Sequence, residues 1–244
     1  MWLQRRGRPA AMELGLALVG LLVGWLVAGL VGGGLLHLLP PGPGQTSAGM
    51  LLGPLVTCTA AVVYWQLGSR LSRGGPQDPH AEDPGPRPPA SVARTSAFIG
   101  LGLLATLAGS MVIGLVMDLL GHTVEEQAAV VKIVQDALSG GPWLPAVALS
   151  VSATLLAPLA EEWLFRGLLY RRIRVAAGPG LAYGCSALAF AAIHNNPTGL
   201  LVYAWLGLVF AVTYQRTGRL AAAMAVHLGN NAFVLATLFL ATDV

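Results

Sequence analysis

Three short polar clusters in the apolar second half of the chain have residue types and spacings that could do chemistry. They are Glu161-Glu162 with Arg166, Phe190 with His194, and His227 with Asn231. Each cluster lies within a long apolar run, where an ionisable side chain at the bilayer centre costs about 2.5 to 3.5 kcal/mol on insertion scales. A functional site is therefore the first hypothesis for them, and the residue types are those of a proteolytic centre.

Helical spacing gives the two adjacent glutamates different surroundings. Glu162 and Arg166 are four residues apart, so they share a helix face and can form an ion pair. Glu161 points about 100° away from that face and is free for chemistry. A buried ion pair that only holds helices together is an equally open interpretation of Glu162 and Arg166.

The other two clusters have the same one-turn spacing. His227 and Asn231 present hydrogen-bonding groups on one helix face, and Phe190 can pack against the ring of His194. Pro158 comes just before the glutamates and lacks the N–H that would bond to the preceding turn. We therefore expect a kink that opens this helix beside the polar groups.

Helix geometry predicts that these polar groups lie at a similar depth in a membrane. Counted from the expected inner end of each helix at about 1.5 Å per residue, Glu161 lies about 15 Å deep and His194 about 21 Å deep. By the same count His227 lies about 12 Å deep, with Asn231 about 6 Å beyond it. All are toward the middle of a hydrocarbon core about 30 Å thick, so we expect them to share one cavity.

The elements that must position these residues are membrane helices. The 244 residues are 55% hydrophobic and 10% charged, with a mean hydropathy of +0.67, whereas a globular chain carries about 25% charged residues. Long apolar runs without alternation exclude a barrel and predict an all-α, polytopic bundle of about seven transmembrane helices, in the range of six to eight. The expected spans are 11–39, 48–68, 95–120, 145–170, 179–195, 199–215 and 220–241.

The basic residues predict the orientation of the bundle. With the N-terminus inside, thirteen of the fourteen Lys and Arg residues fall on the inner side and only Lys132 falls outside. The first run follows Arg5, Arg6 and Arg8 but is longer than the apolar part of a signal peptide, so we expect an uncleaved span and a cytoplasmic N-terminus. The net charge of +3 follows from this topology, and no basic run interleaved with aromatic residues indicates a nucleic-acid partner.

Composition divides the chain into two expected parts and predicts its source. Residues 1–94 would form a transmembrane pair followed by a Pro/Gly-rich cytoplasmic loop, and residues 95–244 would hold the polar clusters. Apolar residues at helical spacing over 122–139 predict an amphipathic helix on the outer interface, either inert or a lid over a substrate entrance. Ala-, Gly- and Pro-rich, Lys-poor residue usage favours a bacterial inner membrane.

The three motifs in this order resemble those of the CPBP intramembrane proteases, which include the type II CAAX prenyl endopeptidases and myxosortase-like members. The resemblance covers the chain from about Trp143 to the C-terminus and makes 95–244 a CPBP-like core. It implies that Glu161 and His194 activate the water that attacks a peptide carbonyl. It also implies that His227 and Asn231 stabilise the oxyanion. The remaining motif residues match supporting positions: Glu162, Arg166 and Phe190.

The resemblance leaves the use of a metal open. Glu161, His194 and His227 could hold zinc with an open position for water. Because the chain lacks an H-E-x-x-H motif and Asn is an unusual zinc ligand, the sequence favours glutamate chemistry without a cofactor. The implied substrate is a membrane-anchored protein or lipidated peptide, cut near its C-terminus as in a CAAX tail or a C-terminal sorting tail.

Two other classes of protein remain open. A transporter or proton-relay protein would also place Glu, His and Arg at mid-membrane. A membrane scaffold or immunity protein could carry the motifs without proteolysis. The complete motif set, without an inverted repeat or paired broken helices, favours a protease over a transporter.

Overall fold

The structure, a computed structural model, describes residues 9–72 and 88–241. Within these ranges the chain is helical and contains no strand. The prediction of a helical membrane bundle is confirmed. The Pro/Gly-rich loop predicted to end residues 1–94 lies largely outside the described residues, as do Arg5, Arg6 and Arg8. The division of the chain at residue 94 stays a prediction.

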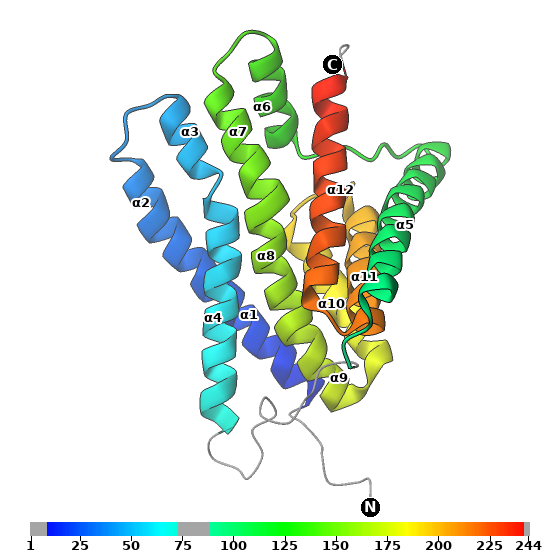
Figure 1. Cartoon of the computed structure of the whole chain (residues 1–244). Coiled ribbons are helices and arrows are strands. Elements are labelled where there is room, and N and C mark those ends of the chain that lie inside the picture. The colour runs from blue at the N-terminus through cyan, green and yellow to red at the C-terminus, as the bar shows by residue number, and fades with distance from the viewer. Residues whose placement is uncertain (1–8, 73–87, 242–244) are drawn as a thin grey trace, which may run out of the picture.

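The N-terminal part is a pair of packed helices (Figure 1). The first helix runs without a break from α1 through a π-helical turn into α2, and the second runs from α3 into α4. Their bounds are α1 Ala10–Val27, η1 Ala28–Gly32, α2 Gly33–Leu36, α3 Pro43–Gly49 and α4 Leu52–Ser72.

The remainder of the chain contains one helix of 35 residues, Trp143–Ala177, and several shorter ones. This long helix changes between α- and π-helical hydrogen bonding along its length: α7 Trp143–Val151, η2 Ser152–Leu156, α8 Ala157–Glu162, η3 Trp163–Tyr170 and α9 Arg171–Ala177. The helices around it are α5 Val92–Leu119, α6 Ala128–Leu138, α10 Pro179–Ile193, α11 Leu200–Thr217 and α12 Leu220–Leu240.

Five helices in the described ranges are long and apolar enough to cross a membrane, by length and composition alone. They are Ala10–Leu36, Pro43–Leu71, Val92–Leu119, Trp143–Ala177 and Leu220–Leu240. The other two predicted spans form α10, a shorter apolar helix of 15 residues, and α11 of 18 residues. Eight of the residues of α11 are buried, because it packs against α5, α10 and α12.

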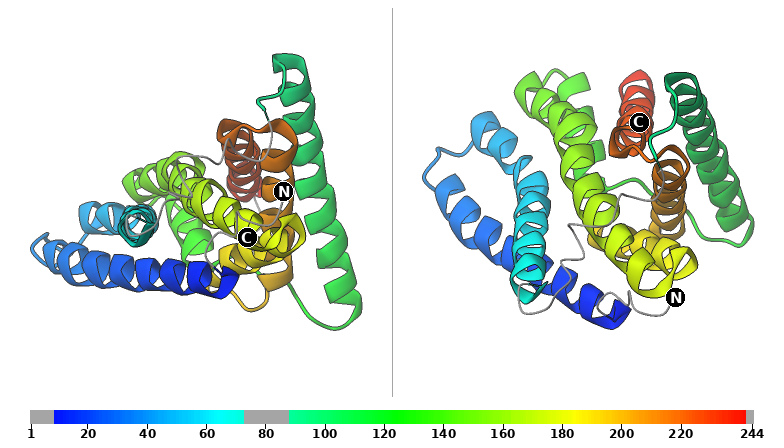
Figure 2. Two further views of the ribbon diagram at one scale, coloured as in Figure 1. Left: turned by 90° about the horizontal axis from the view of Figure 1, so that it is seen from below. Right: turned by 60° about the horizontal axis from the view of Figure 1, so that its bottom comes forward.

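The long helix separates two sides of the molecule. The α1–α4 pair lies on one side of it and α5 on the other, in all three views (Figure 1 and Figure 2). α4 packs against α8 and η3, α12 packs against η2 and α8, and α10 packs against η3 and α9. The glutamate-bearing segment α8 is therefore enclosed by helices from both halves of the chain.

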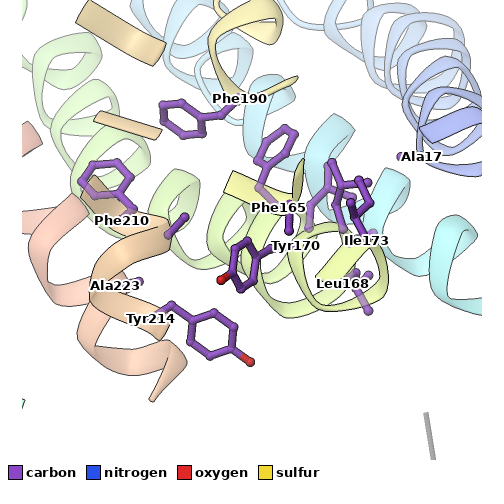
Figure 3. Close-up of a cluster of buried hydrophobic side chains, with 14 of the residues drawn as sticks. Ala17, Phe165, Leu168, Tyr170, Ile173, Phe190, Phe210, Tyr214 and Ala223 are labelled. Atoms are coloured by element: carbon purple, nitrogen blue, oxygen red, sulfur yellow. The ribbon is translucent and has the colours of Figure 1, made fainter. Parts of the chain in front are cut away.

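An aromatic cluster lies in the buried hydrophobic core of the bundle (Figure 3). Phe190 of α10 meets Phe165 of η3 and Phe210 of α11 edge to face, with ring centroids 5.7 and 5.8 Å apart. All three rings are at most 1% exposed. Edge-to-face rings add about 0.5–1.5 kcal/mol per pair beyond their buried area, so this cluster fixes the positions of three helices relative to one another.

The predicted amphipathic helix at 122–139 is shorter than expected, because its first part is not helical. α6 covers 128–138, and residues 122–127 have no regular structure. Side chains of the α10–α11 connection take the place of helical hydrogen bonds there. Asn196 Nδ2 donates to the carbonyl of Glu125 at 2.9 Å, and the Glu125 N–H donates to Thr198 Oγ1 at 3.5 Å.

The helix changes its hydrogen-bonding pattern at Pro158, where the sequence predicted a kink. The chain is π-helical in the turn before the proline, where the Ala157 N–H donates to the carbonyl of Ser152, five residues back. A second π-helical stretch, η3, follows the glutamates. Short π-helical segments within α-helices are frequent at functional sites, and here one of five residues and one of eight flank α8.

Candidate active site

All four residues predicted for chemistry line a single cavity of about 1160 Å³. Glu161 reaches it from α8, His194 from the end of α10, and both His227 and Asn231 from α12. The aromatic cluster lies directly against these groups, since the Phe210 ring stacks on His227 with 4.5 Å between ring centroids. The cavity is thus the place at which the three motifs meet.

Glu162 does not line the cavity but forms a buried network behind it. Arg166 Nη1 donates to Glu162 Oε1 at 2.9 Å, as the spacing predicted, and both side chains are fully buried. The same oxygen also accepts a hydrogen bond from His227 Nδ1 at 3.0 Å. Since an ionised carboxylate only accepts, Nδ1 of His227 carries a proton. Glu162 therefore orients His227 as well as pairing with Arg166.

The guanidinium of Arg166 is held by contacts with two further helices. Its Nη2 donates to the carbonyl of Gly207 in α11 at 2.7 Å. It also lies over the rings of Phe190 and Phe210, 4.7 and 5.2 Å from their centroids. Cations over aromatic faces are stabilised most when both are desolvated, as they are here. The buried arginine therefore links η3 to α10 and α11.

Glu161 is in a different position from its neighbour. Its side chain is 11% exposed, and its Oε2 lies 3.9 Å from Nε2 of His227, too far for a hydrogen bond. Among the described residues no donor forms a hydrogen bond with this oxygen. Of the two glutamates, Glu161 is the one whose carboxylate remains available at the cavity, as the helical spacing predicted.

The tautomer of His194 follows from its contacts. Its Nδ1 lies 2.8 Å from the carbonyl of Phe190, and because a carbonyl can only accept, Nδ1 must carry the proton. The other ring nitrogen, Nε2, then has a free lone pair in the neutral ring. The ring also packs against Phe190, at 4.7 Å between centroids, as the one-turn spacing predicted. His194 is thus fixed in a form that can accept a proton.

Asn231 contacts the glutamate-bearing helix directly. Its Nδ2 donates to the carbonyl of Ala153 in η2 at 2.8 Å. His227 and Asn231 both line the cavity from α12, so the prediction that they share a face of one helix agrees with their positions. The contact between Asn231 and Ala153 joins residues 78 positions apart and was not predicted.

The zinc alternative requires Glu161, His194 and His227 to converge on one ion. Over the described ranges, no three His, Cys, Asp or Glu side chains are grouped so that they could hold a metal. Nδ1 of His227 is engaged by Glu162 and Nδ1 of His194 by a backbone carbonyl, which leaves Nε2 of each ring without a hydrogen bond to the described residues. The three side chains are not grouped about one position in this arrangement, and chemistry without a metal stays a prediction.

Two residues of the site were missed by the sequence analysis. Tyr203 of α11 stacks on His194, with ring centroids 4.0 Å apart and the planes 21° from parallel. Its hydroxyl accepts a hydrogen bond from Gln127 Nε2 at 3.4 Å, which attaches the 122–127 segment to the site. Asn230, 4% exposed, lies beside Asn231 and also lines the cavity. The adjacent pair of Asn residues in an apolar run could have indicated Asn230, whereas no pattern indicated Tyr203.

The segment that carries this site is similar to known proteases. Residues 142–233, from the start of the long helix into α12, match the family described as type II CAAX prenyl endopeptidase Rce1-like. The predicted family resemblance is confirmed over this segment. The membrane-embedded CAAX protease MroQ of Staphylococcus aureus (strain USA300) is 32% identical to this chain over 89 residues. That match covers 34% of this chain and about a third, 36%, of the length of MroQ, and no solved structure matches the chain.

Proposed function

We propose that this protein is an intramembrane endopeptidase that hydrolyses a peptide bond of a membrane-attached substrate by means of Glu161 and His194. The observation that carries the proposal is that both side chains line one cavity between membrane helices together with His227 and Asn231. The match of residues 142–233 to the Rce1-like family supports the same reaction class.

In the proposed reaction, Glu161 and His194 activate the attacking water. Glu161 has a carboxylate oxygen without a hydrogen-bond partner in the described part of the chain, and His194 has an unprotonated Nε2 in its neutral form. One of them removes a proton from the water as it attacks the carbonyl carbon, and a protonated group then supplies a proton to the leaving amine. General acid–base catalysis of this kind contributes about 10² to 10⁴ in rate.

His227 and Asn231 would stabilise the oxyanion that forms on the substrate carbonyl. To donate from Nε2 while Nδ1 donates to Glu162, the His227 ring must carry both protons. Two cations, Arg166 and His227, then balance the two carboxylates Glu161 and Glu162 within the buried group. A neutral total charge reduces the cost of burying all four groups.

The walls of the cavity favour a substrate with an apolar, membrane-embedded part. Beyond the polar groups the lining comes from Trp25 of α1, Pro54 of α4, and Leu107 and Met111 of α5. These side chains offer an apolar surface to a lipid anchor or a helical segment, while the scissile peptide lies beside Glu161. We therefore propose cleavage near the C-terminus of a membrane-anchored protein or lipidated peptide.

The test is cleavage by reconstituted protein of a library of lipidated and C-terminal-anchor peptides. We expect Glu161→Gln and His194→Ala to lower kcat/KM by about 10² to 10⁴. Asp118→Asn and His122→Ala are matched controls, since both residues are exposed and neither lines the cavity. Equal cleavage by wild type and Glu161→Gln would refute the proposal. Folded Glu161→Gln protein that keeps its biological function without cleavage would identify a scaffold instead.

We further propose that the glutamate chemistry proceeds without a metal. The prediction is that purified, active protein contains no stoichiometric zinc and keeps its rate after treatment with a chelator. Metal content measured by mass spectrometry, alongside the rate before and after chelation, decides this. Loss of activity on chelation with recovery on adding one equivalent of zinc would establish the metalloprotease alternative.

A further inference from the structure

The carbonyl oxygen of Ala153, in the helix that carries Glu161, has lost its helical hydrogen-bond donor. In an α-helix it would accept from the N–H of Ala157, but that N–H donates to Ser152 in the π-helical turn. In π-helical bonding the donor would be residue 158, which is a proline and has no N–H. A carbonyl left unpaired inside a protein is destabilising, so another donor is needed.

One side chain of α12 donates to this carbonyl, and the adjacent side chain donates to the first. Asn231 Nδ2 donates to Ala153 at 2.8 Å, and since the carbonyl can only accept, this contact fixes which end of the amide faces the long helix. The Oδ1 of Asn231 must then point elsewhere. It accepts a hydrogen bond from Nδ2 of Asn230 at 3.3 Å. The amide of Asn231 is therefore held at both of its ends.

We propose that Asn230 is a positioning residue of the active site, which acts through the amide of Asn231. With Oδ1 bonded to Asn230 and one N–H bonded to Ala153, one N–H of Asn231 remains to donate into the cavity that both residues line. This inference rests on the proposed function, in which Asn231 donates to the oxyanion. Donors fixed in advance stabilise a developing charge without having to reorganise during the reaction.

Pro158 belongs to the same arrangement. It lies three residues before Glu161, and its missing N–H is one reason why the Ala153 carbonyl is free to anchor Asn231. The residue that disturbs the helix beside the proposed catalytic glutamate thus also contributes to the contact between α12 and that helix. A chain of interactions therefore runs from α12 to α8: Asn230 donates to Asn231, Asn231 donates to the Ala153 carbonyl, and Pro158 leaves that carbonyl without a helical donor.

The first test measures the effect of Asn230→Asp on catalysis. The carboxylate of Asp is isosteric with the amide but only accepts, so Asn231 would have to turn its NH2 group toward residue 230 and lose its bond to Ala153. We expect kcat to fall by about 10- to 100-fold with KM unchanged. This is smaller than the fall in kcat of about 10² to 10³ that follows complete removal of an oxyanion donor, because Asn231 itself is still present. Asn195→Asp, at an exposed residue that does not line the cavity, is the matched control and keeps the wild-type kcat. An unchanged kcat in Asn230→Asp, or a rise in KM alone, overturns the proposal.

The second test needs no substrate and is a double-mutant cycle in thermal unfolding. Pro158→Ala restores an N–H that can donate to Ala153, so Asn231→Ala should lower the unfolding temperature less in the Pro158→Ala protein than in wild type. Equal shifts in the two backgrounds overturn the anchoring of Asn231. If wild-type protein cleaves no peptide, the proposed function is wrong. The double-mutant cycle does not depend on cleavage, so it still decides whether Asn231 is anchored to the Ala153 carbonyl.

Discussion

At the scale of single residues, the two adjacent glutamates differ in the groups that surround each of them. One oxygen of Glu162 accepts from both Arg166 and His227, in a fully buried position. Oε2 of each glutamate lacks a hydrogen-bond donor among the described residues, but Glu161 lines the cavity and Glu162 does not. The supporting carboxylate is therefore held by Arg166 and His227, whereas its neighbour faces the cavity.

Removal of one partner of the Glu162–Arg166 pair should be more harmful than removal of both. Arg166→Met leaves a buried carboxylate without its main partner, and breaking buried pairs in this way costs about 3–5 kcal/mol of unfolding free energy. The double variant Glu162→Gln/Arg166→Met keeps an acceptor for His227 and removes both charges, so we expect a smaller loss. Unfolding of both proteins in detergent micelles measures the difference. A double variant less stable than Arg166→Met would contradict this account.

At the scale of helices, the position of Arg166 depends on the close approach of α10 and α11. Gly207 of α11 has no side chain at the contact, and a Cβ placed there would lie 2.9 Å from Cα of Ala187 and 3.1 Å from its carbonyl oxygen. The carbonyl of Gly207 is also the one that accepts from Arg166. The helix contact and the buried arginine are thus coupled through one glycine.

Gly207→Ala should therefore reduce both stability and activity. The added methyl group meets backbone atoms that cannot move aside alone, and overpacking of this kind costs about 1–3 kcal/mol. It would also displace the carbonyl from Arg166. Gly184→Ala in α10 is the control, because a Cβ there meets nothing within 4 Å, and we expect no loss of stability. Unfolding temperature and peptide cleavage rate are the measurements, and equal behaviour of the two variants would refute the prediction.

At the scale of the whole molecule, a second buried polar group joins the N-terminal helix pair to the long helix. The hydroxyl of Tyr64 in α4 donates to Glu13 Oε2 of α1 at 2.9 Å. Arg172 of α9 lies 3.6 Å from the same oxygen, 4.1 Å from the centroid of the Tyr64 ring, and donates to the Tyr64 carbonyl at 3.1 Å. The N-terminal pair, outside the segment that matches the protease family, is therefore attached to the helix that carries Glu161.

Tyr64→Phe tests how much this attachment contributes to stability. The variant keeps the ring beneath Arg172 and removes only the hydroxyl that donates to Glu13. Since hydrogen bonds to charged groups contribute about 1.5–3 kcal/mol, we expect a loss of that size in the free energy of unfolding. Trp65→Phe, at a neighbouring ring that is 47% exposed, serves for comparison. A loss in Trp65→Phe as large as that in Tyr64→Phe would show that the hydroxyl is not responsible.

The sequence by itself determined the features that depend on neighbours along one helix. The apolar runs predicted a helical membrane bundle, and the four-residue spacings predicted the contact of Arg166 with Glu162 and of Phe190 with His194. The order of the motifs predicted the family resemblance. These inferences succeed because the period of an α-helix fixes which residues share a face, whatever surrounds the helix.

Only the tertiary structure decided which groups meet across helices. It brought His227 against Glu162 over 65 positions and Asn231 against the carbonyl of Ala153 over 78, and it replaced the first part of the predicted 122–139 helix by a segment bonded to Asn196. No local spacing encodes these contacts, since they depend on how the helices pack and on where π-helical turns free a backbone carbonyl. The residue types of the site could therefore be predicted from the sequence, but the partner of each polar atom was set by the packing of the helices.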